Sequence, residues 1–240
     1  MSIALVTGAN KGIGLETSRQ LAQAGVHVIL AARDAAKGAA AAAQLKSEGL
    51  AVEALTLDVT SAASIAAAVR EVDAKHGRLD ILINNAGVDA GDRTKKVSEQ
   101  TMEAWRKTFD TNVFGLIAVT QAFMPLLEKS PAGRIVNLSS VLGSITLHAD
   151  PKSPIYSLKL AAYNVSKSAV NAYTVQLAYE LRNSKIKVNA VHPGHVKTDM
   201  GGPAAPMELV DGAKSGVAMA LIGSDGPNGT YTHMGRALPW

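Results

Sequence analysis

The stretch IALVTGANKGIG, residues 3–14, joins a short apolar run to a glycine-rich turn and then to a helix-forming segment. Glycines allow a tight turn and a close approach of the backbone to phosphate groups, and a helix N-terminus offers free N–H groups to an anion. The spacing Gly-x-x-x-Gly-x-Gly differs from the common dinucleotide fingerprint, so the turn indicates a nucleotide site mainly through its place after a first strand. The candidate phosphate-binding residues are Gly8, Asn10, Lys11, Gly12, Ile13 and Gly14.

The same alternation of apolar run and helix continues along the chain. Short β-rich runs cover residues 3–7, 26–31, 52–57, 79–84, 134–138 and 186–192, and a last strand is expected near 229–232. Helical segments lie near 12–24, 34–48, 61–76, 100–129, 155–183 and 206–221. Near-continuous apolar strands alternating with helices predict a parallel sheet with helices on both faces. Because no linker divides the chain, we expect residues 1–240 to form one doubly wound α/β domain.

Composition argues against several classes of protein. The 240 residues are 47% hydrophobic and 18% charged, and the absence of cysteine rules out disulfides, thiolate nucleophiles and cysteine-bound zinc. The six histidines are scattered, with no pair at ligand spacing on one element, so we expect no metal in the reaction. The net charge of +4 comes from dispersed basic residues, which argues against nucleic acid. With no apolar run of membrane-spanning length and no basic leader, a cytoplasmic protein without a membrane partner is expected.

The end of the second strand bears on the choice of cofactor. An acid there would bind a free ribose 2′-hydroxyl, but the chain has Ala32 and Arg33. Together with Lys11 in the glycine turn, Arg33 suits a 2′-phosphate, which favours NADP over NAD. Arg33 as a solvated charge at a strand end is the alternative. Asp34 either contacts the ribose or, as we prefer, caps the following helix.

Two further strand ends carry candidate cofactor contacts. Asp58 and Val59 follow the third strand and are placed against the adenine. The sequence NNAG, residues 84–87, follows the fourth strand, and its amides, small residue and glycine suit a tight turn packed against a flat ligand. A purely structural turn would look the same. The candidates from this turn are Asn85, Ala86 and Gly87.

The sequence YNVSK, residues 163–167, places Tyr163 and Lys167 one helical turn apart. A tyrosine hydroxyl loses its proton only near pH ~10 when unperturbed. A neighbouring ammonium group favours the phenolate, so we expect Lys167 to lower the pKa of Tyr163. The pair is a candidate proton-transfer device, although an isolated pair of this kind also occurs as surface decoration.

Four motifs follow one another in a fixed order: TGANKGIG after the first strand, NNAG after the fourth, IVNLSS on the fifth and YNVSK on the next helix. Together they resemble the short-chain dehydrogenase/reductase family, from Ile3 to about residue 235. The resemblance implies the single-domain Rossmann fold and a nicotinamide cofactor. Within the family, NKGIG, AARD and the C-terminal segment are most similar to the NADPH-dependent carbonyl reductases.

The resemblance assigns roles to individual residues. Tyr163 and Lys167 match the family's catalytic pair, whereas Tyr156 has a leucine four residues later. Ser140 matches the serine that hydrogen-bonds the reacting oxygen, with Ser139 a weaker claimant. Asn112 matches the asparagine that holds a water in the proton relay; a helix kink or a core hydrogen bond is its alternative role.

The loop PGHVKT, residues 193–198, matches the family's nicotinamide loop. Its candidate cofactor contacts are Pro193, Gly194, Val196 and Thr198. The Gly/Pro-rich stretch that follows, up to Met207, is expected to form a lid over the substrate.

Two departures from the family pattern matter. Tyr163 lies 23 positions after Ser140, more than is usual, so an added segment at about 144–160 is expected before the catalytic helix. In the carbonyl reductases such a segment covers the helix faces used for tetramer assembly, so a monomer or homodimer is favoured over the usual tetramer. His195 stands where those enzymes often have a tryptophan, which puts their aromatic substrate preferences in doubt.

These patterns predict an NADPH-dependent reductase of ketones or aldehydes, acting on small hydrophobic carbonyl compounds. An NAD-dependent alcohol dehydrogenase working oxidatively and a non-catalytic NADPH-binding sensor are the alternatives. The substrate candidates are Leu142, Tyr156, His195, Met200 and Trp240, with Val88, Ile145 and Leu147 also expected near the mouth of the pocket.

Overall fold

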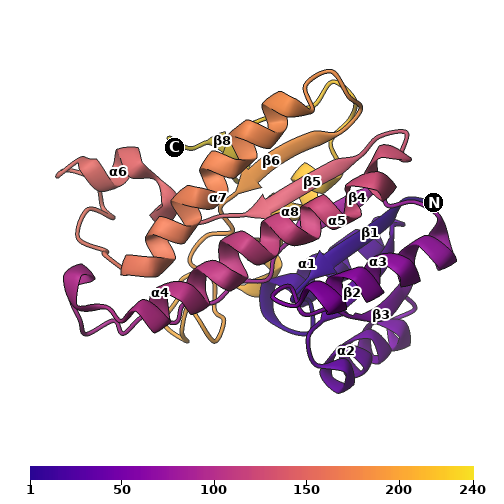
Figure 1. The fold of residues 1–240 in the computed structure, drawn as a ribbon, viewed down its shortest axis with the longest axis horizontal. Coiled ribbons are helices and arrows are strands. Elements are labelled where there is room, and N and C mark those ends of the chain that lie inside the picture. The colour runs from indigo at the N-terminus through magenta and orange to yellow at the C-terminus, as the bar shows by residue number, and fades with distance from the viewer.

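Eight strands form one sheet in the order β3-β2-β1-β4-β5-β6-β7-β8 in the computed structural model, which describes all of residues 1–240 (Figure 1). Every neighbouring pair is parallel except β7 and β8, which are antiparallel. The strands are β1 (Ile3–Thr7), β2 (His27–Ala32), β3 (Val52–Thr56), β4 (Ile81–Asn84), β5 (Arg134–Leu138), β6 (Lys187–Val191), β7 (Tyr231–His233) and β8 (Arg236–Ala237).

Helices cover both faces of this sheet. One layer contains α3 (Ala62–His76), α4 (Met102–Phe109), α5 (Leu116–Glu128) and α7 (Ala161–Glu180). The other contains α1 (Gly12–Gln23), α2 (Ala35–Ser47) and α8 (Leu209–Ala220), while the short α6 (Ile145–Ala149) lies apart at one end of the molecule (Figure 1).

The strands are mainly apolar because both of their faces are buried. In β1, Ile3 and Leu5 pack with the α3–α5–α7 layer, whereas Ala4 and Val6 pack with the α1–α2–α8 layer. Side chains alternate between the two faces of a strand, so a run such as IALV supplies both cores at once. The two cores are separate clusters of buried side chains divided by the sheet.

The predicted fold class and strand pattern are confirmed, with shifts at several boundaries. The expected helix over 100–129 is divided by a π-helical turn, η2 (Asp110–Gly115). The expected helix over 155–183 begins only at Ala161, because α6 and a series of turns occupy residues 145–160. The last strand lies at 231–233 instead of 229–232, and β8 follows it as a strand that the sequence pattern did not indicate.

The order of strands places the ligand site. The chain runs from β1 outward to β3 on one side, then returns to β4 beside β1 and continues outward on the other side. In open α/β sheets ligands bind beyond the carboxyl ends of the strands at such a switch point. The glycine turn after β1 and the NNAG turn after β4 therefore meet at the same edge of the sheet.

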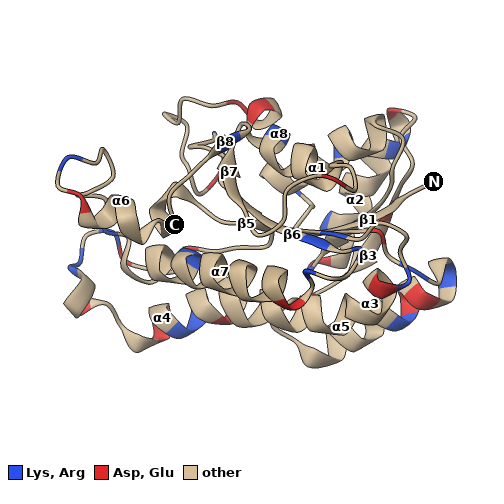
Figure 2. Ribbon diagram, turned by 90° about the horizontal axis from the view of Figure 1, so that it is seen from above, with Lys and Arg blue, Asp and Glu red and all other residues tan.

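Charged residues of both signs are interspersed over the helices, most visibly along α3, and form no single basic stripe (Figure 2). None of the helices combines the length and the apolar character that a membrane crossing requires.

Candidate active site

A cavity of about 500 Å³ opens at the carboxyl ends of the strands, where the sequence motifs converge. It runs from the glycine turn after β1, past the ends of β2 to β4, to the start of α7 and the loop after β6. The predicted residues that line it are Gly8, Asn10, Lys11, Gly12, Ile13, Gly14, Arg33, Asp58, Val59, Asn85, Ala86, Gly87, Tyr163, Lys167, Pro193, Thr198 and Met200.

The glycine turn is held by the turn after β4. Asn85 donates hydrogen bonds from Nδ2 to the carbonyl oxygens of Thr7 (2.7 Å) and Gly8 (3.1 Å). Gly8 has a φ of +63°, in the left-handed region that favours glycine. A Cβ on Gly14 would lie 2.4 Å from Asn85 Nδ2 and 2.8 Å from the Gly8 carbonyl oxygen. The NNAG turn therefore holds the glycine turn in place through Asn85, and its residues Asn85, Ala86 and Gly87 also line the cavity.

The start of α1 is built to receive an anion. Lys11 is the N-cap residue, and its side chain makes no capping hydrogen bond, so the first N–H groups of the helix face the cavity without a side-chain acceptor. The exposed Arg33 lies on the cavity wall and Lys11 at the rim. Lys11 is paired there with Asp199 across the mouth at 2.5 Å, a partner that the sequence did not indicate.

Two acids near the cofactor end have local structural contacts. Asp34 accepts a hydrogen bond from the backbone N–H of Lys37 at 3.0 Å and caps α2, as preferred from the sequence. Asp58 accepts from the backbone N–H (2.9 Å) and the hydroxyl (2.7 Å) of Thr60. Asp58 therefore shapes the turn after β3 while its backbone lies on the cavity wall.

The two serines at the end of β5 point in different directions. Ser139 lines the cavity and donates from its hydroxyl to the carbonyl oxygen of Lys167 at 3.3 Å. Ser140 caps the short 3-10 turn η3 (Val141–Gly143) by accepting from the Leu142 N–H at 3.2 Å, and its hydroxyl also hydrogen-bonds Tyr163. Ser140 is not among the residues that line the cavity, and it is the hydrogen bond with Tyr163 that favours Ser140 over Ser139 as the partner of the reacting oxygen.

The pKa of Tyr163 moves opposite to the direction expected from the Tyr–Lys spacing. Burial raises it to about 12, and the negative charge of Asp89 adds to this effect; the hydrogen bond with Ser140 and the charge of Arg93 oppose it. The expected lowering by Lys167 was wrong for this state, because the loss of solvent around the phenol outweighs the attraction of a charge 5.7 Å from the ring centre. Tyr163 is therefore protonated at neutral pH, the form that can donate a proton.

Lys167 is itself shifted. Its ammonium donates a hydrogen bond to the carbonyl oxygen of Leu138 at 2.6 Å, and the residue is only 5% exposed. Burial lowers its pKa from 10.5 to about 8. Lys167 is thus still mainly charged at neutral pH, but the charge is costly to hold inside the protein.

This shift predicts a pH-dependent stability. Between about pH 8 and 10.5 the unfolded chain keeps a proton on Lys167 that the folded chain has lost, so the free energy of unfolding rises with pH in this window. Between pH 8 and 10 the rise from this group is about 2 kcal/mol. Urea unfolding of the wild type and of Lys167→Met across this range measures it, and the variant is expected to lack this part of the rise. Equal pH dependence in both proteins would contradict the buried ammonium.

Asn112 occupies the π-helical turn and is 1% exposed. Its Oδ1 accepts from the Val88 N–H at 2.8 Å, and its Nδ2 donates to the Val88 carbonyl oxygen at 2.8 Å and to the Ser166 hydroxyl at 3.0 Å. π-Bulges are often found at functional sites. Here the bulge turns an amide inward, so that Asn112 joins the loop after β4 to the helix that carries Tyr163 and Lys167.

The loop after β6 contributes only part of its predicted contacts. Pro193 and Thr198 line the cavity, but Gly194 and Val196 do not. Val196 is buried beneath the loop, where it packs against Gly212 of α8 and pairs with Met207. Contact of Gly194 and Val196 with a cofactor stays a prediction.

The substrate candidates diverge more from expectation. Met200 lines the cavity, as does Val88, whereas Leu142, Ile145 and Leu147 lie outside it. Tyr156 is 43% exposed under the ammonium of Lys159, and the exposed His195 faces the carbonyl oxygen of Gly201. Trp240 stacks on Tyr231, with ring centres 5.4 Å apart. None of these three side chains lines the cavity, and their contact with a substrate stays a prediction.

Several cavity residues were missed by sequence reasoning. Thr111 precedes Asn112 in the π-helical turn, Lys197 and Asp199 come from the loop after β6, and Leu209 begins α8. A link across the mouth was missed as well: Arg93 pairs with Asp89 and donates to the Met200 carbonyl oxygen at 3.2 Å. No local pattern signals such contacts, because they join loops about 100 residues apart.

Known proteins resemble the chain over nearly its full length. A family model described as short chain dehydrogenase matches residues 2–209. A short-chain dehydrogenase, anuI, of Penicillium roqueforti is 38% identical, with 92% of this chain and 89% of the relative covered. Carbonyl reductase [NADPH] 1 of Pongo abelii is 33% identical, with 100% and 99% covered.

A solved structure shows the same likeness in three dimensions. NADPH-bound carbonyl reductase from chicken fatty liver superposes with a TM-score of 0.85 at 28% identity, covering 100% of both chains. With its single doubly wound domain, its glycine turn and its Ser140–Tyr163–Lys167 cluster at the switch point of the sheet, this chain belongs to the short-chain dehydrogenase/reductase family.

Proposed function

We propose that this protein reduces ketone or aldehyde carbonyls of small hydrophobic compounds to alcohols, with NADPH as the hydride donor. The observation that carries the proposal is the single cavity that has Arg33 and the start of α1 at one end and Tyr163, hydrogen-bonded to Ser140, at the other. Relatives named as carbonyl reductases support carbonyl chemistry for this chain.

The residues present fit a phosphorylated dinucleotide. Gly8 and Gly14 leave a cradle that a Cβ would fill, and the uncapped start of α1 supplies N–H groups to a pyrophosphate. Arg33 stands at the end of β2, where a 2′-phosphate would lie and where an acid would select NAD. Its planar guanidinium suits bidentate contact with a phosphate.

Bound NADPH supplies a hydride to the carbonyl carbon of the substrate. Tyr163, neutral at physiological pH, donates the proton that the carbonyl oxygen gains as charge builds on it. Ser140 donates a hydrogen bond to the same oxygen and stabilises that charge. One hydride and one proton give the alcohol, and Tyr163 is then reprotonated from solvent.

Two further residues hold this acid in place. Lys167, fixed between the Leu138 carbonyl oxygen and the ring of Tyr163, stabilises the transient phenolate by its positive charge. Asn112 joins the loop after β4 to α7, and we assign to it the anchoring of the water through which the proton returns. The apolar side chains of Val88, Met200 and Leu209 on the cavity wall suit a hydrophobic substrate.

Arg33→Ala tests the cofactor assignment. The variant is expected to lose about 10- to 100-fold in kcat/KM for NADPH, the effect of removing a charge-assisted contact to a phosphate, with little change for NADH. Steady-state rates with both cofactors, over a panel of aldehydes, aromatic ketones, ketoesters and diones, measure it. Lys37→Ala is the matched control, because Lys37 is an exposed cation of the next helix that does not line the cavity.

The same panel separates the alternatives. Equal or better use of NADH by the wild type would favour an NAD-dependent alcohol dehydrogenase, for which Arg33 is only a solvated charge. Tight NADPH binding without consumption of any carbonyl compound would favour a sensor.

We also propose a monomer or homodimer, because the segment 144–160 lies over the start of α7. Light scattering of the purified protein tests this proposal, and a tetramer would contradict it.

A further inference from the structure

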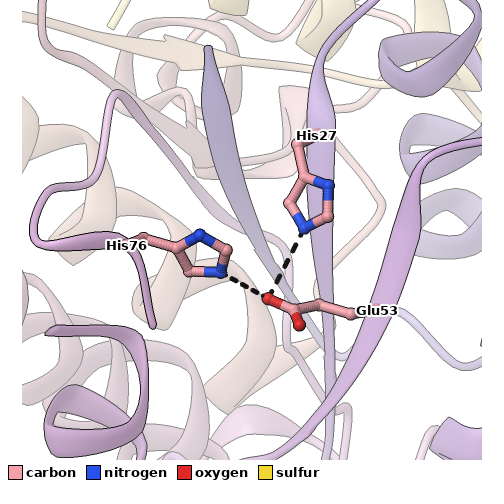
Figure 3. A group of neighbouring side chains, drawn as sticks. All are labelled: His27, Glu53 and His76. Atoms are coloured by element: carbon pink, nitrogen blue, oxygen red, sulfur yellow. Dashed lines mark hydrogen bonds and ion pairs between the residues drawn. The ribbon is translucent and has the colours of Figure 1, made fainter. Parts of the chain in front are cut away.

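Three side chains with metal-binding atoms meet at the end of the sheet opposite the cavity. His27 begins β2, Glu53 is the second residue of β3 and His76 is the last residue of α3 (Figure 3). Their ligand atoms, one from each residue, all lie within 4.8 Å of one another. None of the three takes part in the chemistry proposed above.

The register of the sheet brings them together. Glu53 pairs with Ile29, so its side chain lies on the same face as those of Ile29 and His27. The helix α3 packs on that face through Ile65 and Val72, and its last turn places His76 over the strand ends. The cluster is therefore held by two strands and a helix with a buried core behind it.

One carboxylate oxygen is the centre of the cluster. Glu53 Oε1 lies 2.5 Å from His76 Nε2 and 3.5 Å from His27 Nε2. The His27 Nε2 atom is buried and has no hydrogen-bond partner. Lys75 approaches the other oxygen, Oε2, at 3.6 Å and is held at 2.7 Å by Glu71. Buried polar atoms normally have a hydrogen-bond partner. The hydrogen bonds within the cluster therefore do not explain why His27 Nε2 points at the Glu53 carboxylate without forming one.

We propose that His27, Glu53 and His76 bind one Zn²⁺ ion. Two imidazole nitrogens and a carboxylate oxygen are a donor set that Zn²⁺ favours, whereas Mg²⁺ and Ca²⁺ prefer oxygen ligands alone. A tetrahedral zinc ion separates its ligand atoms by about 3.3 Å. The Glu53–His27 edge already has this length, and the Glu53–His76 edge must open by less than an ångström through side-chain rotation.

The fourth ligand is water. The three side chains are 16 to 24% exposed, so one side of the cluster is open to solvent. Lys75 keeps its ion pairs with Glu53 Oε2 and with Glu71, so it does not compete for Oε1, the oxygen that binds the metal. The ion joins β2, β3 and α3 at the edge of the sheet, and its role is structural, because it lies at the opposite end of the strands from Tyr163.

Zinc titration of the purified full-length chain tests the proposal. Calorimetry is expected to show one ion per chain, and saturating Zn²⁺ to raise Tm by about 5 to 10 °C, since the ion binds only the folded state. With Co²⁺ as a probe, a visible absorption band of tetrahedral intensity is expected. Turnover with NADPH is expected to be the same with and without the metal.

His27→Gln is the sharpest variant, because His27 Nε2 makes no hydrogen bond whose loss would disturb the metal-free fold. It is expected to lower zinc affinity at least 10-fold and to abolish the Tm rise and the cobalt band, as are Glu53→Gln and His76→Gln. His233→Gln is the control. His233 and His192 are the other close imidazole pair, with ring centres 4.9 Å apart, but the Nδ1 atoms of both already have backbone partners.

The outcomes separate cleanly. Loss of zinc binding in the three variants, with retention in His233→Gln and unchanged NADPH binding in all, supports the site. No binding by the wild type at millimolar Zn²⁺, equal affinity in His27→Gln and wild type, or loss only in His233→Gln would each overturn it.

Discussion

Tyr163→Phe is expected to lower kcat by about 10³-fold while leaving the affinity for NADPH nearly unchanged. The substitution removes one oxygen atom, and with it the proton donor, but keeps the ring that packs beside Lys167. Loss of a positioned general acid typically costs 10² to 10⁴ in rate. Turnover with the best carbonyl compound of the panel, and fluorescence titration with NADPH, measure the two quantities separately.

Tyr156→Phe is the matched control. Tyr156 lies seven residues earlier, is 43% exposed and does not line the cavity, so this variant is expected to turn over at close to the wild-type rate. Near-normal turnover in Tyr163→Phe, or an equal loss in both variants, would remove Tyr163 from its role as the acid.

Gly14→Ala is expected to weaken cofactor binding and to destabilise the fold at the same time. The added methyl group would lie 2.4 Å from Asn85 Nδ2 and 2.8 Å from the Gly8 carbonyl oxygen. Asn85 must then leave its hydrogen bonds to Thr7 and Gly8, and the glycine turn must move from under the phosphates. We expect at least a 10-fold loss of NADPH affinity, together with a loss of stability of about 1–3 kcal/mol from overpacking.

Gly216→Ala controls for a methyl group added to a helical glycine elsewhere. A Cβ at Gly216 of α8 meets only Leu138 Cδ1, at an ordinary 3.9 Å, so NADPH affinity should be unchanged. Comparison of NADPH affinity in the two variants shows whether a loss comes from the close approach at Gly14 or from any alanine that replaces a helical glycine. Equal NADPH affinity in Gly14→Ala and wild type would contradict the cradle.

The sequence was sufficient to predict the fold, and it named the residues that the structure brings together at the centre of the candidate site. Strands buried on both faces are mainly apolar, so runs such as 3–7 and 134–138 can be recognised from the sequence without knowledge of their neighbours. The glycine turn and the Tyr163–Lys167 pair are local patterns, complete within one turn or one helix. Asp34 was identified as a helix cap for the same reason.

Properties that depend on surroundings could not be predicted in this way. The direction of the Tyr163 pKa is set by burial, which spacing along a helix does not encode. Whether Trp240 and Tyr156 reach the substrate depends on long-range packing, which the sequence does not show. In the structure neither side chain lines the cavity. His27, Glu53 and His76 appeared scattered in the sequence, because strand pairing and helix packing, not spacing, bring them together.

In the proposed reaction, a hydride passes from NADPH to a carbonyl carbon and Tyr163 is the acid. The transfer of a deuterium label from the cofactor to the product tests this reaction directly. Purified protein is given NADPH that carries deuterium at the transferable position, with the best substrate of the panel, and the product is examined by mass spectrometry. We expect one alcohol per NADPH consumed, one deuterium on the former carbonyl carbon, and loss of the product with Tyr163→Phe. Unlabelled alcohol, or undiminished labelled product from Tyr163→Phe, would contradict it.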